Sequence, residues 1–280
     1  RIPPDPGAPA PDALSPAGPP APAAGFEAAA GRMRSLSRRA AAEAVGTFAL
    51  VLIGTGAAVV DARTRGALGP VGVALAFGAV VTAMVYALGH LSGAHINPAV
   101  TVALGYAGCF PRRDVAPYVA AQCIGAILAS LSLRAILGEA GGLGATVPAI
   151  GIGRSLAVEW LLSFLLMFVI FSVTTDERMV AGFAAIPVGL AVGFGVLVGG
   201  PLTGPSMNPA RSLGPAAAGG EWAGHWIYWV APVTAMLAAV HVYDLLRPAG
   251  TYPGVPAPAA AQDPAPEVNL ALPPRSNGQG

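Results

Sequence analysis

Two copies of the triplet Asn-Pro-Ala interrupt otherwise apolar parts of the sequence. Asn is a preferred N-cap and Pro is favoured at the first helical position, so each triplet predicts the start of a helix. The apolar segment after each triplet has only about ten residues, roughly half of what a helix needs to cross a bilayer. We therefore expect two half-helices at membrane depth, each entered by a tight turn at Gly93 or Gly204. The six residues of the triplets are Asn97, Pro98, Ala99, Asn208, Pro209 and Ala210.

The two asparagines offer a specific solute chemistry. Their side-chain carbonyls can cap the helices, which leaves the amide nitrogens free to donate to a passing molecule. If the half-helices meet end to end, each N-terminus contributes roughly half a positive elementary charge. That field repels cations and hydronium but passes neutral dipoles, and a water held by both amides breaks a proton wire. The alternative is that Asn97 and Asn208 only cap their helices.

A charged side chain is costly inside an apolar stretch and by default marks a functional site there. Arg211, one turn into the second half-helix, would orient a solute and repel cations, although an Arg can also snorkel to lipid headgroups. Glu43 and Glu159 could relay protons, but their symmetric placement favours a structural role: each carboxylate accepts N–H bonds from the irregular loop of its own half. His95 is a pH-sensitive contact or, as we prefer, a neutral hydrogen-bonding spacer, and Gln122 can bond a loop.

The elements that must position these residues are six long apolar stretches. Charged residues make up only 10% of the 280 residues, against roughly 25% in soluble domains, so the surface is expected to face lipid. Each stretch is about as long as a membrane-spanning helix. The predicted spans lie near residues 38–60, 70–90, 115–136, 155–175, 180–200 and 225–246.

The chain is also internally repeated. Asn97 follows Glu43 by 54 residues, and Asn208 follows Glu159 by 49. The halves, about 38–136 and 154–246, each hold three spans and one half-helix. Because three is odd, the two halves enter the membrane from opposite sides, which predicts inverted repeats whose half-helices meet near the midplane. The predicted fold class is therefore an all-α membrane protein with six transmembrane helices and two re-entrant half-helices.

Arginines near the ends of the spans predict the orientation. Arg32, Arg34, Arg38 and Arg39 precede the first span, so both termini are expected on the cytoplasmic side of a multi-pass cell-membrane protein. The bias is modest, since other arginines fall on the opposite side. The Pro- and Ala-rich segments 1–34 and 248–280 are expected to be disordered tails around a membrane domain over 35–247.

Composition and spacing exclude several other functions. A net charge of +1 argues against nucleic acid as a partner. Cys109 and Cys123 have no metal-ligand spacing and the four histidines do not cluster, so no metal is expected. We find no nucleophile–base pair and no cofactor loop. The sequence thus predicts neither an enzyme nor a cofactor.

Several segments resemble the aquaporins, the major intrinsic protein family, over roughly residues 38–247. The two signature loops are SGAHINPAV (92–100) and GPSMNPARSLGPA (204–216), supported by AEAVGTF (42–48) and HWIYWVAP (225–232). The resemblance implies an aquaporin-like channel domain of six tilted helices, with the half-helices packed end to end. It also implies a homotetramer in membrane lipid, in which every protomer conducts water and small neutral solutes through its own pore.

The resemblance further implies a narrow selectivity filter formed by Phe77, Val196, Pro205 and Arg211. The chain departs from both common patterns of the family here. Strict water channels usually have His where Val196 stands, and glycerol facilitators have Asp where Ser212 stands. Val196 is similar to nodulin-like members, which pass glycerol and metalloid hydroxides, whereas Ser212 is typical of water channels.

We therefore expect a passive channel for water and small uncharged solutes, such as glycerol and metalloid hydroxides, that excludes ions and protons. The alternative is an ion-coupled secondary transporter, because inverted repeats and broken helices also occur in that class. In that case Glu43 and Glu159 would carry protons.

Overall fold

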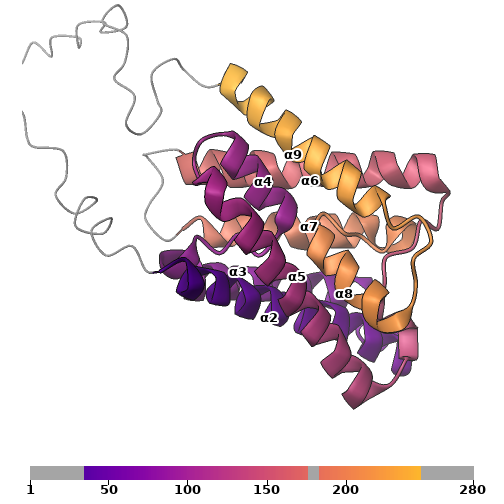
Figure 1. Cartoon of the computed structure of the whole chain (residues 1–280). Coiled ribbons are helices and arrows are strands. Elements are labelled where there is room, and N and C mark those ends of the chain that lie inside the picture. The colour runs from indigo at the N-terminus through magenta and orange to yellow at the C-terminus, as the bar shows by residue number, and fades with distance from the viewer. Residues whose placement is uncertain (1–34, 176–182, 247–280) are drawn as a thin grey trace, which may run out of the picture. The chain divides into compact units, whose positions relative to one another are not determined.

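The computed structural model describes residues 35–175 and 183–246. The expected disordered tails, 1–34 and 248–280, lie outside the described residues. The part of the chain that is described is helical, and its path can be followed in Figure 1.

Within residues 35–175 and 183–246, six helices are long and apolar enough to cross a membrane, which confirms the predicted number of spans. They are α2 (Leu36–Arg63), α3 (Gly69–Ser92), α5 (Arg112–Leu137), α6 (Ile152–Thr175), α7 (Ala185–Thr203) and α9 (Ile227–Leu246). The largest difference from the predicted bounds is at α7, expected from 180: residues 183 and 184 form a turn before it, and 180–182 are not described.

The two predicted half-helices are also present. They are α4 (Pro98–Tyr106), with nine residues, and α8 (Pro209–Gly219), with eleven. At 1.5 Å per residue they are only about 14 and 17 Å long, half of the hydrocarbon thickness. A short 3₁₀ segment, η1 (Ala140–Gly144), lies between α5 and α6 and contacts α8.

The packing pattern confirms the inverted repeat. In the first half α2 packs against α3 and α5, and in the second half α6 packs in the same way against α7 and α9. The halves join where α3 contacts α7. Each half-helix packs on the last helix of the other half, α4 on α9 and α8 on α5, and also on the last helix of its own half, α4 on α5 and α8 on α9.

Close helix crossings depend on residues without side chains. A Cβ atom on Gly125 of α5 would lie 2.2 Å from the carbonyl oxygen of Ala44 in α2. At the α3–α7 contact, a Cβ atom on Gly189 would lie 1.8 Å from Thr82 Oγ1. Small residues let membrane helices approach at backbone distance, which brings the cavity-lining helices together.

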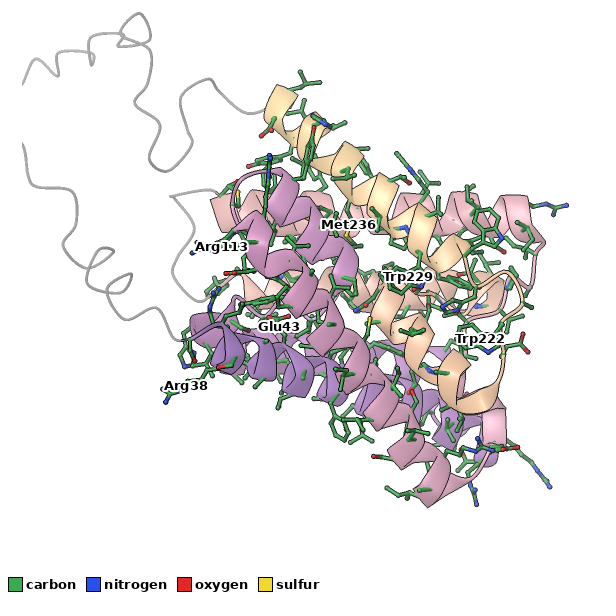
Figure 2. All side chains as sticks on the ribbon, viewed as in Figure 1. Arg38, Glu43, Arg113, Trp222, Trp229 and Met236 are labelled. Atoms are coloured by element: carbon green, nitrogen blue, oxygen red, sulfur yellow. The ribbon has the colours of Figure 1, made fainter. Side chains whose placement is uncertain are left out.

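The outward faces of the long helices are apolar. Leu75, Ile136 and Phe194 are each more than 60% exposed, as expected for side chains that contact lipid rather than water. Polar residues gather at the helix ends: Figure 2 shows Arg38 and Arg113 near one end and Trp222 near the other. Arginine and tryptophan are typical of the two membrane–water interfaces. The described residues thus form a multi-pass membrane protein.

Candidate pore

The chain enters each half-helix through left-handed backbone. Gly93 and Gly204 end α3 and α7 with φ values of 91° and 61°. The turns then continue through non-glycine residues in the same region: Ala94 at 47°, Ile96 at 43° and Met207 at 51°. Such a conformation costs on the order of 1–3 kcal/mol at each non-glycine residue, so the surrounding structure must stabilise both loops.

The first loop is held by the carboxylate of Glu43, which Figure 2 shows among the helices. Its Oε1 accepts from Ser92 Oγ at 2.7 Å and from the His95 N–H at 3.0 Å. Its Oε2 accepts from the Ile96 N–H at 2.6 Å and from Gln122 Nε2 at 2.8 Å. Glu43 is fully buried, and these four donors replace the water that its charge would otherwise need.

Glu159 is bonded in the same way in the second half. Its Oε1 accepts from Thr203 Oγ1 at 2.7 Å and from the Ser206 N–H at 3.0 Å, and its Oε2 accepts from the Met207 N–H at 3.0 Å. Both oxygens of each carboxylate accept hydrogen bonds from protein groups. Each carboxylate therefore anchors irregular backbone at membrane depth. Neither carboxylate lines the cavity described below.

Each asparagine caps its half-helix. Asn97 Oδ1 accepts from the Ala99 N–H at 2.9 Å, and Asn208 Oδ1 accepts from the Ala210 and Arg211 N–H groups at 3.0 and 3.3 Å. Both caps have extended backbone, and a proline follows each at the first helical position. The local chemistry that predicted the two helix starts is therefore present in both halves.

The two loops are bonded directly to each other. Asn97 Nδ2 donates to the carbonyl oxygen of Met207, and Asn208 Nδ2 donates to that of Ile96, both at 2.8 Å. The half-helix N-termini therefore do meet. The expectation that both amide groups are wholly free to donate to a solute was therefore wrong. Each amide has two N–H hydrogens, of which one is bonded to the opposite loop and the other is left to donate to a solute.

Arg211 lies beside this junction and is only 4% exposed. Its Nη1 donates to the carbonyl oxygen of Gly144 in η1 at 2.8 Å, so a segment outside the two signature loops orients the guanidinium. Its Cζ is 5.2 Å from the ring centroid of Phe77, within cation–π range. Its Nε is buried and has no hydrogen-bond partner among the described residues, so this N–H is one of the guanidinium donors that the protein does not use.

His95 contacts polar and aromatic neighbours on the other side of the junction. Its Nδ1 lies 3.1 Å from Thr101 Oγ1, and its ring centroid lies 4.7 Å from that of Phe110 and 5.3 Å from that of Tyr118. The backbone of His95 is bonded to Glu43 at the same time. These contacts fix the ring where it contributes to the cavity wall.

A single cavity of about 100 Å³ connects these groups. Since one water needs about 10–15 Å³ of such space, it has room for several waters. Both asparagines line it, and so do the four residues predicted for the filter and the loop residues 93–97 and 205–208. The remaining wall is aliphatic apart from Thr174. It comes from α2, α3, α4, α6, α7 and the turn before α7: Leu50, Val81, Val85, Val100, Leu104, Leu166, Ile170, Thr174, Ala184, Val188 and Val192.

Sequence reasoning missed several supports of the loops. Tyr118 and Tyr228 donate to the carbonyl oxygens of Ser92 and Thr203 at 2.9 and 2.8 Å, one in each half. Alignment of the two halves could have found the acceptors, because Ser92 and Thr203 each lie five positions before the asparagine of their triplet. No comparable feature of the sequence indicated the contact of Arg211 with Gly144.

The fold and the cavity define a channel-forming membrane protein built from inverted repeats. Comparison with known proteins gives the same class. The profile described as "Major intrinsic protein" matches residues 31–243, and the chain therefore belongs to the major intrinsic protein family.

Two relatives are plant proteins. The chain is 44% identical to aquaporin NIP1-2 of Oryza sativa subsp. japonica over 214 residues, which cover 74% of this chain and 70% of the relative. It is also 44% identical to nodulin-26 of Glycine max over 207 residues, 74% of this chain and 76% of the relative. Among solved structures, the aquaglyceroporin from Plasmodium falciparum matches with a TM-score of 0.65 and 26% identity, covering 75% of this chain and 96% of that one.

Proposed function

We propose that the chain is a passive channel for water and small uncharged solutes that excludes ions and protons. The observation that supports this most directly is the junction of two half-helix N-termini in the wall of a mainly aliphatic cavity. The two N-termini add roughly one positive elementary charge of field where they meet. A neutral dipole can turn in that field, whereas a cation must overcome it after losing its hydration shell.

The charges around the cavity favour a channel over an ion-coupled transporter. Arg211 is the one permanently charged side chain among the described residues that line it. A transporter that couples to protons or sodium needs an acceptor for the cation in its path. Glu43 and Glu159 could have served, but their oxygens are engaged by the loops of their own halves.

Phe77, Val196, Pro205 and Arg211 form the selectivity filter in this proposal. Val196 offers no hydrogen-bond donor and less bulk than the histidine of strict water channels, so the opening is wide enough for glycerol as well as water. The similarity to an aquaglyceroporin supports the same range of solutes. Metalloid hydroxides are of comparable size, are uncharged at neutral pH and carry hydroxyl groups that Arg211 and the asparagines can bond.

The proposal includes an assembly and an orientation. By the resemblance to aquaporins, the chain forms a homotetramer in which each protomer conducts, with both termini in the cytoplasm. Native mass spectrometry in detergent would show a single fourfold mass, and a monomer or dimer would count against the assembly. Labelling of a cysteine introduced at Ser35 in intact cells would test the orientation.

Stopped-flow light scattering on proteoliposomes tests the function. We expect water, glycerol and arsenite to permeate faster than through empty vesicles, at rates that an imposed proton gradient does not change. Solute uptake that depends on the proton gradient would show that the chain is an ion-coupled transporter and not a passive channel. If vesicles that contain intact tetrameric protein are no more permeable than empty vesicles, the proposed function is wrong.

Replacing Val196 with His tests the filter. The larger, polar ring narrows the opening and donates a hydrogen bond, so glycerol permeability is expected to fall roughly tenfold or more while water permeability changes little. The measurement is the ratio of the two permeabilities, with Val198→His as the control because Val198 is exposed on the outer face of the same helix. An equal loss of both permeabilities in Val196→His would argue against Val196 as a filter residue.

A further inference from the structure

Gly54 of α2 lies directly behind the ring of Phe77. A Cβ atom built on Gly54 would lie 2.3 Å from Cε1, 2.4 Å from Cδ1 and 2.7 Å from Cζ of that ring. All three distances are far below a carbon–carbon van der Waals contact of about 3.5–4.0 Å. The ring therefore occupies the volume in which any other residue at position 54 would have its side chain.

The ring of Phe77 is confined on its other sides. It is 3% exposed, it lines the cavity, and the guanidinium of Arg211 lies over it at 5.2 Å. Gly144 in turn holds that guanidinium. Arg211 and the cavity are next to the ring, so a buried ring pushed away from α2 moves toward them.

We propose that Gly54 is a positioning residue for solute selectivity: its missing side chain lets Phe77 recede into α2 and so sets the width of the cavity at Arg211. This inference rests on the proposed function, since width matters only if solutes pass. It adds to the filter a residue from a helix that contributes none of the four filter side chains. Gly54 itself does not line the cavity and acts only through Phe77.

The test compares Gly54→Ala with Gly56→Ala in the same helix. A Cβ atom on Gly56 would meet Leu133 Cδ2 of α5 at 3.2 Å, so this control crowds a buried aliphatic contact that is not in the cavity wall. We expect Gly54→Ala to lower the glycerol-to-water permeability ratio by about tenfold. Gly56→Ala should leave the ratio unchanged, because partial loss of folded protein reduces both permeabilities alike.

A second pair of variants tests whether the effect passes through the ring. With Phe77→Ala the space behind the ring is empty, so adding Gly54→Ala should no longer change the permeability ratio. The same cycle applies to the melting temperature in detergent, where Gly54→Ala should lower it in the wild-type background and not in Phe77→Ala.

The outcomes separate this inference from the proposed function. An unchanged or increased ratio in Gly54→Ala, in vesicles whose wild-type control conducts both solutes, would overturn the positioning role alone. So would equal effects of Gly54→Ala in both backgrounds. If the wild-type chain conducts neither solute, the proposed function fails, and the selectivity role of Gly54 falls with it even where the melting temperatures show coupling to the ring.

Discussion

Replacing Arg211 with Val is expected to make the channel leak cations and protons. The guanidinium is a full positive charge held almost without exposure in the cavity wall, so it acts on a passing cation through little intervening water. Two unit charges about 4 Å apart repel by about 4 kcal/mol at an effective dielectric constant of 20. Removing one therefore raises cation permeability by about two to three orders of magnitude, since each 1.4 kcal/mol is a factor of ten.

The measurement is the decay of an imposed proton or sodium gradient in proteoliposomes, followed with a pH-sensitive or sodium-sensitive dye. Arg211→Lys is the matched control because it keeps the charge and loses the planar fork that bonds Gly144. We expect Arg211→Lys to exclude ions and to alter solute selectivity. If the ion gradient decays no faster with Arg211→Val than with the wild type, the opposed half-helices exclude ions without the arginine.

Replacing Glu159 with Ala is expected to destabilise the protein strongly. The change leaves the N–H groups of Ser206 and Met207 without an acceptor in a buried loop. An unsatisfied buried donor costs about 1–3 kcal/mol, so these two alone account for roughly 2–6 kcal/mol. Met207 also has a left-handed backbone that the carboxylate helps to hold, so the loop that carries Asn208 should lose its conformation.

The thermal unfolding midpoint in detergent measures this loss, and water permeability per reconstituted protein chain measures its effect on the pore. Glu159→Gln is the matched control: it keeps the shape and one oxygen acceptor, and it removes the ionisable group. A proton-coupled role would make Glu159→Gln as inactive as Glu159→Ala. Because the amide nitrogen of the glutamine faces a donor where an oxygen accepted, we expect Glu159→Gln to unfold at a temperature between those of Glu159→Ala and the wild type. We also expect it to keep more water permeability than Glu159→Ala, and an equal loss in the two variants would contradict the anchoring role.

Much of the fold could be predicted because it depends on short segments of sequence. The length and hydropathy of a stretch such as 155–175 are enough to predict that it spans a membrane, and α6 covers Ile152–Thr175. The starts of α4 and α8 were predicted for a similar reason: an asparagine cap and a proline act on the next three residues, whatever the rest of the chain does. The bounds of α7 were less accurate, because its apolar run continues into the preceding turn.

The candidate site was predicted only in part. The repeat and the two triplets indicated that Asn97 and Asn208 meet, and the cross-loop bonds agree with that. The filter residues came from resemblance, and their role stays a prediction although all four line the cavity. Neither route indicated that each asparagine amide already bonds the opposite loop, because those acceptors are carbonyl groups whose direction depends on left-handed backbone at Ile96 and Met207.

By itself, then, the sequence determined six spans, two half-helices, their caps and the inverted order of the halves, since each follows from local periodicity, length or capping chemistry. The tertiary structure decided which groups remain available to a solute: the contacts of Asn97 with Met207, Arg211 with Gly144 and Phe77 with Gly54. The first two pairs are 110 and 67 residues apart in the chain, and the third joins two neighbouring helices. Such contacts form only when helices from different parts of the chain pack, and no local pattern encodes the distance between them.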